Sequence, residues 1–293
     1  MKQDKKDLIK NILKVPTISD NLEYRLRDSL VDMVKDIDGI EYEIDKVGNL
    51  IITKHEDKLG EDEYFPCVVA HIDTVYRSHE YLVHNNISLN IEEEEEYTEE
   101  GDTLNILYAL HPLTGEQTGI GGDDKAGVGI CMLLLMESEE PLKVMFFVSE
   151  EIGCKGSKAI DESYFEDVGY FIQFDAPGDD WVSESTSGVT LYTDEALEQI
   201  QDILDDYSMS NYSTDPFTDV MALKKRSDVV CFNFFAGYYR MHTSKEIVIL
   251  DFLEKSFNMS SEIISRLGNN KFEFKYEPNT YKGNNMFGGG LFY

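Results

Sequence analysis

The sequence predicts an α/β protein built as a three-layer α/β/α sandwich with a mostly parallel central sheet. Two observations indicate this class: short apolar runs alternate with segments of helical periodicity along most of the 293 residues, and polar motifs follow several of the runs. Alternating strands and helices are typical of a parallel sheet with helices on both faces. With 42% hydrophobic residues the chain can fill one large core, so we expect a single domain over residues 1–293.

The individual elements follow from apolar spacing, which repeats every three to four residues in a helix and every two in a half-buried strand. In chain order this spacing predicts helices at 5–14 and 22–36, a hairpin of strands at 40–46 and 49–54, a buried strand ending at His71, a helix at 124–137, a strand at 143–148, a helix at 155–162, a strand at 169–174, helices at 194–207 and 219–225, a strand at 229–235 and a helix at 247–266.

Two stretches lack this regular spacing. Residues 77–120 read as an irregular acidic excursion from the sheet, in which the glutamate run 92–96 is a solvated loop or a hairpin edge. The tail 269–293 carries a predicted edge strand at 271–276 and no predicted chemistry.

Composition excludes several classes of partner. The chain has 57 acidic and 26 basic residues, a formal net charge of -31, which opposes binding to nucleic acid. Four cysteines without paired CxxC spacing indicate buried free thiols and a reducing compartment: Cys67, Cys131, Cys154 and Cys231. The first residues lack the apolar core of a signal peptide, and no apolar run is long enough to cross a bilayer. We therefore expect a cytoplasmic protein with no membrane or nucleic-acid partner.

Five polar motifs carry the groups that bind divalent cations, and we expect each at the end of a buried strand, where α/β sheets place their ligand sites. They are HID at 71–73, GGDDKAG at 121–127, EEIG at 150–153, FD at 174–175 and HTS at 242–244. A pair of cations about 3.5–4 Å apart needs one carboxylate that touches both, and Asp123 is the natural bridge. Asp73 shares a strand face with His71, so it can hold the ring nitrogen that faces away from the cations.

The adjacent Glu150 and Glu151 complete a hydrolytic site. Neighbouring side chains at a strand end point to different sides, so one can bind a cation while the other acts on water as a general base. A cation that lowers the pKa of water to about 7, together with a base that adds roughly 10²–10⁴ in rate, suffices for amide hydrolysis. The other histidines lie in polar segments and are given no role: His55, His79, His84 and His111.

The ordered series HIDT, GGDDKAG, SEEIG, FDAPG and YRMHTSKE resembles the co-catalytic di-zinc exopeptidases, in particular peptidase T-like tripeptidases and tetrahedral-type aminopeptidases. The resemblance implies two groups of ligands that share one residue: His71, Asp123 and Asp175 for one cation, and Asp123, Glu151 and His242 for the other. It also implies Glu150 as the base and a cis peptide between Asp123 and Asp124. Zinc is the expected metal, and cobalt or manganese would suit the same ligands.

The chain departs from these families in size. Relatives carry an inserted second domain of about a hundred residues, whereas here Asp73 and Asp123 are 50 positions apart and Asp175 and His242 are 67 apart. We therefore expect a catalytic domain alone over 1–293, without a lid or dimerisation domain, acting as a monomer or small oligomer. A local residue must then stabilise the oxyanion, and the candidates are Tyr212, Tyr238 and Arg240.

The leading hypothesis is an exopeptidase that removes amino-terminal residues from short peptides. Its substrate contacts are predicted at Asp219, Arg240 and Tyr212, with Asp219 or Glu184 holding the free amine. Thr218 and Asp219 resemble a Thr-Asp segment that lines the site in the family, whereas Tyr239 and Arg240 stand in the reverse of the family order.

Two alternatives remain open. An amidohydrolase of deacylase or carboxypeptidase type would bind a substrate carboxylate through an arginine such as Arg77, Arg226 or Arg240. A non-catalytic metal-binding interaction protein is the third hypothesis. The presence of all five ligands and of Glu150 speaks against it.

Overall fold

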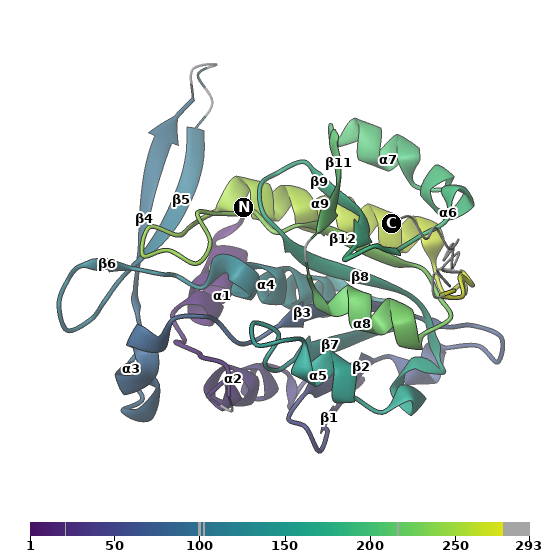
Figure 1. Cartoon of the computed structure of the whole chain (residues 1–293), viewed down its shortest axis with the longest axis horizontal. Coiled ribbons are helices and arrows are strands. Elements are labelled where there is room, and N and C mark those ends of the chain that lie inside the picture. The colour runs from purple at the N-terminus through teal and green to yellow at the C-terminus, as the bar shows by residue number, and fades with distance from the viewer. Residues whose placement is uncertain (21, 99–100, 102, 216, 278–293) are drawn as a thin grey trace, which may run out of the picture.

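The structure is a computed structural model that describes residues 1–20, 22–98, 101, 103–215 and 217–277 (Figure 1). Its main sheet runs in the order β1-β2-β7-β3-β8-β12-β9-β10, with β11 paired to β9. The strands are β1 (Ile40–Ile44), β2 (Leu50–Lys54), β3 (Phe65–His71), β7 (Leu142–Phe147), β8 (Val168–Ala176), β9 (Trp181–Thr186), β10 (Val189–Thr190), β11 (Asn211–Asp215) and β12 (Cys231–Phe235). The central strands β7, β3, β8 and β12 are parallel to one another, which confirms the predicted fold class.

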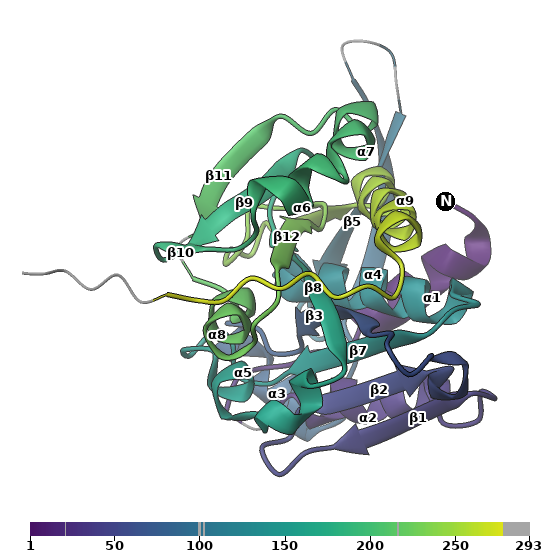
Figure 2. The same ribbon diagram turned by 90° about the vertical axis from the view of Figure 1, so that its right-hand side faces the viewer.

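Helices cover both faces of this sheet (Figure 2). On one face α4 (Gly122–Glu137) packs against β3 and β8, and α1 (Gln3–Leu13) and α9 (Leu250–Leu267) pack on α4. The other face carries α5 (Lys155–Ala159) and α8 (Asp219–Arg226). Since α4 lies between the sheet and two helices, it is buried from Gly122 to Leu135, which explains why residues 126–135 are apolar on every side. The remaining helical elements are α2 (Tyr24–Val34), η1 (Glu56–Lys58), η2 (Arg77–His79), α3 (Glu80–His84), η3 (Glu162–Phe165), α6 (Asp194–Glu198) and α7 (Gln201–Asp206).

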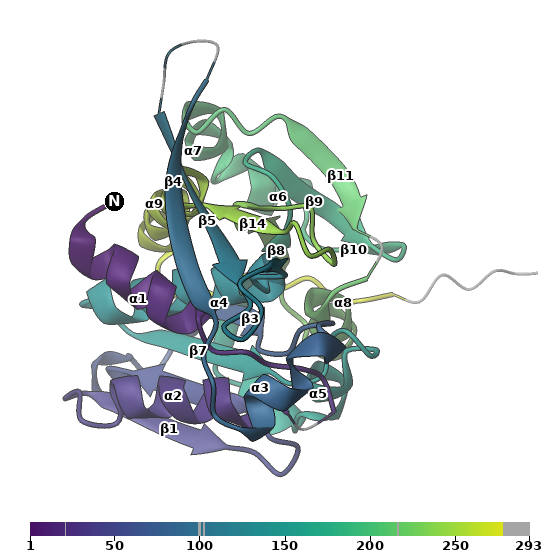
Figure 3. The same ribbon diagram turned by 90° about the vertical axis from the view of Figure 1, so that its left-hand side faces the viewer.

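The predicted irregular excursion is wrong in one respect, because residues 77–120 supply most of a second sheet. This sheet runs β13-β14-β5-β4, with β6 on β5. Its strands are β4 (Asn90–Tyr97), β5 (Thr103–Leu110), β6 (Gln117–Thr118), β13 (Tyr238–Tyr239) and β14 (Ile247–Ile249). The glutamate run lies on β4, in a hairpin that projects from the body of the molecule (Figure 3). Almost every β4 side chain is exposed, so the strand lacks the apolar alternation by which sequence reasoning recognises strands.

Smaller differences have similar causes. The predicted helix 194–207 is two helices, α6 and α7, and the helix predicted from residue 247 begins only at Leu250, because 247–249 pair as β14 with β5. Of the predicted edge strand at 271–276, the structure shows only a bridge between Glu273 and Val229. Residues 278–293 of the tail lie outside the described residues. The four cysteines are buried and free, as predicted. Within the described ranges, every helix is too short or too polar to cross a membrane.

Candidate active site

Three of the five motifs lie at the carboxyl edge of the main sheet, as predicted. His71 ends β3, Asp175 is the penultimate residue of β8, and Glu150 and Glu151 follow β7. The other two motifs do not follow strands of this sheet, which corrects the prediction. The Asp123 motif follows β6, and the His242 motif lies in the turn between β13 and β14. The second sheet therefore delivers two of the five ligand segments.

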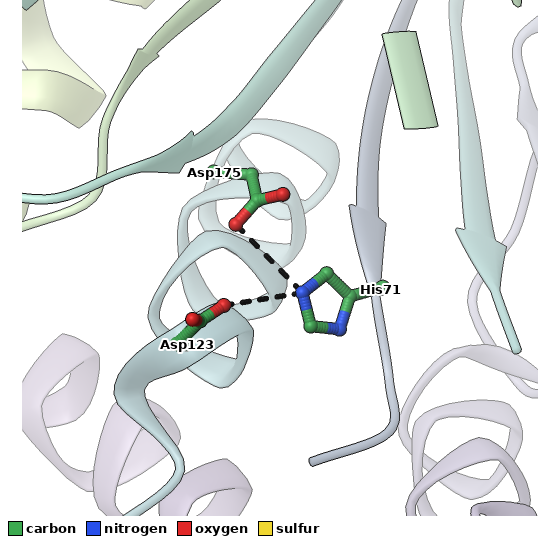
Figure 4. Close-up of side chains that lie close together, drawn as sticks. All are labelled: His71, Asp123 and Asp175. Atoms are coloured by element: carbon green, nitrogen blue, oxygen red, sulfur yellow. Dashed lines mark hydrogen bonds and ion pairs between the residues drawn. The ribbon is translucent and has the colours of Figure 1, made fainter. Parts of the chain in front are cut away.

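The first predicted ligand group lies together in the structure (Figure 4). The Nε2 atom of His71 is 3.2 Å from Oδ1 of Asp123 and 3.7 Å from Oδ1 of Asp175. The histidine is buried, and both carboxylates reach it from other elements, Asp123 from the start of α4 and Asp175 from β8. One imidazole nitrogen thus faces two carboxylate oxygens at once.

The second predicted group also lies together and shares Asp123 with the first. The Nε2 atom of His242 is 3.1 Å from Oδ2 of Asp123 and 3.1 Å from Oε1 of Glu151. Asp123 therefore directs Oδ1 to His71 and Oδ2 to His242, the arrangement of a bridging ligand. The cis peptide expected between Asp123 and Asp124 is also present.

These separations fit divalent cations. Zinc binds nitrogen and oxygen ligands at about 2.0–2.2 Å, so the ligand atoms around a tetrahedral zinc ion lie about 3.4 Å apart. The distances from each histidine to its carboxylates, 3.1–3.7 Å, agree with that value, and all ligand atoms of a group lie within 4.8 Å of one another. Imidazole and carboxylate are also the ligand types that such cations take at hydrolytic sites. The five residues thus fit a pair of divalent cations.

The electrostatics of the site also favour bound cations. Burial, together with the charges of Asp175, Asp219 and Glu151, raises the pKa of Glu150 to about 9. Burial also raises the pKa of Asp175 to about 8, with Asp123 contributing. Two like charges 4 Å apart repel by about 4 kcal/mol at an effective dielectric constant of 20. Cations among these carboxylates would offset that repulsion.

Asp73 links His71 of the first ligand group to Glu150 and to Glu151 of the second group. Its Oδ1 accepts the backbone N–H of Glu150 at 2.8 Å, and its Oδ2 accepts that of Glu151 at 3.2 Å and the hydroxyl of Ser19 at 2.7 Å. The Nδ1 atom of His71 lies 3.4 Å from Oδ1 and 3.2 Å from the backbone oxygen of Asp73. Asp73 is fully buried, so it orients the histidine and both glutamates without reaching the substrate.

Glu246 is a site residue that sequence reasoning missed. Its buried carboxylate accepts the N–H of Gly121 at 2.6 Å and of Asp123 at 3.1 Å, together with the hydroxyl of Tyr76 at 2.7 Å. Glu246 lies four residues after His242, so its hydrogen bonds link the loop that carries His242 to the loop that carries Asp123. Glu246 stands within the YRMHTSKE motif, but its partners are more than a hundred positions away, so local pattern could not reveal the role.

We predict that Glu246→Gln destabilises the protein and displaces Asp123. The amide nitrogen would face one of the N–H donors, and an unsatisfied buried donor costs about 1–3 kcal/mol. A shift of the bridging carboxylate weakens cation binding, which metal titration would detect alongside thermal unfolding. Tyr76→Phe removes the hydroxyl that donates to Glu246 and to the backbone oxygen of Thr243 but leaves both N–H donors paired, so it should cost less. Lys245→Gln, an exposed neighbour, should match the unmodified protein. Equal unfolding free energy and equal cation affinity in Glu246→Gln would contradict this role.

A cavity of about 270 Å³ opens beside the two groups. Its residues come from both sheets and the loops between them: Asp123, Glu150, Glu151, Asp175, Pro177, Trp181, Phe217, Tyr238, Met241 and His242. Glu150 thus faces the cavity, and its Oε2 lies 3.9 Å from Nε2 of His71. Among the described residues that line the cavity there is no lysine or arginine.

The predicted substrate contacts lie outside this lining. Asp219 is fully buried and accepts a hydrogen bond from Ser157, so it cannot meet a substrate amine directly. Tyr212 lies on β11, where its hydroxyl accepts a hydrogen bond from Gln201. Arg240 is exposed in the tight turn before His242, with φ at 57°. Of the three candidate oxyanion donors, Tyr238 alone lines the described cavity, and its hydroxyl donates to Asp175 at 3.3 Å.

The fold is that of solved peptidase structures. The chain is similar to aminopeptidase PepT from Bacillus cereus ATCC 10987 (13% identity, TM-score 0.63, 90% of this chain and 98% of that chain). It is also similar to the TET1 peptidase of Pyrococcus horikoshii (18%, 0.58, 88% and 98%) and to a tripeptidase from Staphylococcus aureus (12%, 0.60, 89% and 97%). No family model and no curated protein sequence matches the chain. At these identities the likeness shows the fold, and at that level it confirms the resemblance seen in the motifs.

Proposed function

We propose that this chain is a metal-dependent exopeptidase that removes amino-terminal residues from short peptides with two divalent cations, zinc in the first instance. The observation that carries the proposal is the position of Asp123, whose two oxygens face two separate histidine–carboxylate groups. The fold shared with solved aminopeptidases and a tripeptidase supports it. We also propose that residues 1–293 act as a single catalytic domain.

The residues of the site would have two separate roles in hydrolysis, cation binding and proton transfer. His71, Asp123 and Asp175 would hold one cation, and Asp123, Glu151 and His242 the other. When bound, such cations polarise the scissile carbonyl and lower the pKa of water. Glu150, which belongs to neither group but lines the cavity, takes a proton from the attacking water and returns it to the amine released when the C–N bond breaks.

The cavity favours the amino terminus of a peptide over its carboxyl terminus. A substrate carboxylate needs a cationic side chain, and the described lining offers none. Two of the three arginines of the amidohydrolase hypothesis are engaged elsewhere: Arg77 with Asp20, and Arg226 with Glu162 and the backbone oxygens of Ser157 and Ile160. The third, Arg240, is exposed and lies outside the described lining. A cavity of about 270 Å³ also suits one or two residues of a short peptide better than a folded protein.

We predict that peptides with a free amine are hydrolysed roughly 100-fold faster, in kcat/KM, than their N-acetylated counterparts, because the acetyl group adds bulk at the end of the peptide that must fit a cavity of about 270 Å³. The measurement compares Leu-Gly-Gly with N-acetyl-Leu-Gly-Gly on the zinc-loaded protein. A chelator should abolish both reactions. Faster cleavage of the acetylated peptide would favour the amidohydrolase alternative instead.

A further inference from the structure

The cavity has two chemically different halves. The ligand residues and Glu150 form one, and the other is apolar: Pro177, Trp181, Phe217, Tyr238 and Met241. The apolar residues come from four places in the chain, the β8–β9 connection, β9, the segment before α8, and the β13 strand with its following turn. Segments far apart in sequence therefore converge to place apolar surface beside the two ligand groups.

Two of these apolar side chains are exposed to solvent. Phe217 is 39% and Met241 is 42% exposed, which places them with the few large apolar side chains that the described surface leaves open. Single exposed apolar residues are common, but two at the mouth of one cavity form a patch, and such patches often mark binding sites.

The apolar half also lacks the charges that would select an ionic side chain. Four carboxylates line the other half, and two divalent cations would balance their charge. Lys158 lies beside the apolar half, with its Nζ 5.0 Å from the centre of the Phe217 ring, but it donates to the backbone oxygen of Gly153 and does not line the described cavity. An acidic side chain of a substrate would have no cationic partner among the described lining residues. An apolar side chain would move from water onto an apolar surface, which is favourable.

We propose that this apolar half is the subsite for the side chain of the substrate's amino-terminal residue, and that it selects a large apolar side chain such as leucine or phenylalanine. The identification of that residue as amino-terminal rests on the proposed function. The preference itself rests on the lining. Burying one large apolar side chain corresponds to roughly 10- to 100-fold in affinity, and this is the expected discrimination of leucine over alanine or glutamate.

The chain contains one tryptophan, Trp181, and it lines this half of the cavity, so its fluorescence reports occupancy without any turnover. The experiment titrates the zinc-loaded Glu150→Gln protein with Leu-Ala, Ala-Ala, Glu-Ala and Lys-Ala. We expect Leu-Ala to change the fluorescence and to bind at least tenfold more tightly than the other three. No change with any dipeptide, or equal affinity for Glu-Ala or Lys-Ala, would overturn the subsite.

A second arm uses turnover by the zinc-loaded protein. Met241→Ala should lower kcat/KM for Leu-Ala five- to tenfold and change that for Ala-Ala less than twofold. Ile44→Ala, an equally exposed apolar residue on the distant edge strand β1, should change neither. An equal fall for both dipeptides in Met241→Ala contradicts the subsite. If Leu-Ala alters the fluorescence but no free-amine peptide is cleaved, the subsite stands and the proposed peptidase function fails.

Discussion

The Glu150→Gln variant is expected to lose roughly 10²–10⁴ in kcat while keeping both cations. Glutamine has nearly the shape of glutamate but cannot take a proton from water. The backbone N–H of residue 150 would still donate to Asp73. Glu150 belongs to neither ligand group, so cation stoichiometry should stay at the value of the unmodified protein. Steady-state kinetics and metal analysis of the same preparation make the measurement.

The neighbouring Glu151→Gln variant is the matched control, because it makes the same chemical change one residue along. The Oε1 atom of Glu151 lies 3.1 Å from Nε2 of His242, within the second ligand group. This variant should lose affinity for one cation as well as activity. The assignment of roles would be wrong if Glu150→Gln lost a cation, or if it kept more than a tenth of the activity.

The second large effect is expected from Asp123→Ala, which removes the carboxylate shared by both groups. Binding of both cations should weaken by roughly 100-fold or more, since even residues that only support a ligand contribute 10- to 100-fold to affinity. Added zinc should then no longer raise the unfolding temperature, because stabilisation by a bound ion requires concentrations above its dissociation constant. Isothermal titration and thermal unfolding with and without zinc provide the measurements.

Asp175→Ala serves as the comparison, because Asp175 belongs to the first group alone. It should weaken one cation and leave the other bound at His242 and Glu151. Equal losses in Asp123→Ala and Asp175→Ala would show that Asp123 does not bridge. An apoprotein control separates the loss of cations from misfolding. Since Asp123→Ala also removes the contacts of Asp123 with His71 and His242, the unfolding temperature of the metal-free variant is compared with that of the metal-free unmodified protein.

The sequence predicted the parts of the fold and site that local pattern encodes. The parallel core follows from buried apolar runs, and the five proposed ligands come from motifs whose side chains the structure brings together. Strand β4 was not predicted because almost all of its side chains are exposed. The role of Glu246 was not predicted because it depends on a contact between positions 121 and 246. Such long-range contacts leave no local periodicity, so they require coordinates.

The substrate contacts were the least predictable part of the site. Asp219 follows the family-like Thr218, yet it is buried outside the cavity lining. Of the apolar lining, Pro177 and Met241 lie within motifs but had no predicted role, and Trp181 and Phe217 lie outside the motifs. Phe217 lies next to Thr218, and Met241 lies next to His242. Neither residue could be recognised as part of the lining without knowing its exposure. Motifs identify the chemistry of a site here, whereas the shape of its pocket depends on which loops meet.

Anomalous diffraction from crystals of the zinc-loaded protein, recorded at the zinc absorption edge, tests the central claim most directly. We predict two peaks about 3.5–4 Å apart, both beside Asp123, one next to His71 and Asp175 and the other next to Glu151 and His242. A single peak, or two peaks of which neither lies within bonding distance of Asp123, would contradict a bridged pair of cations.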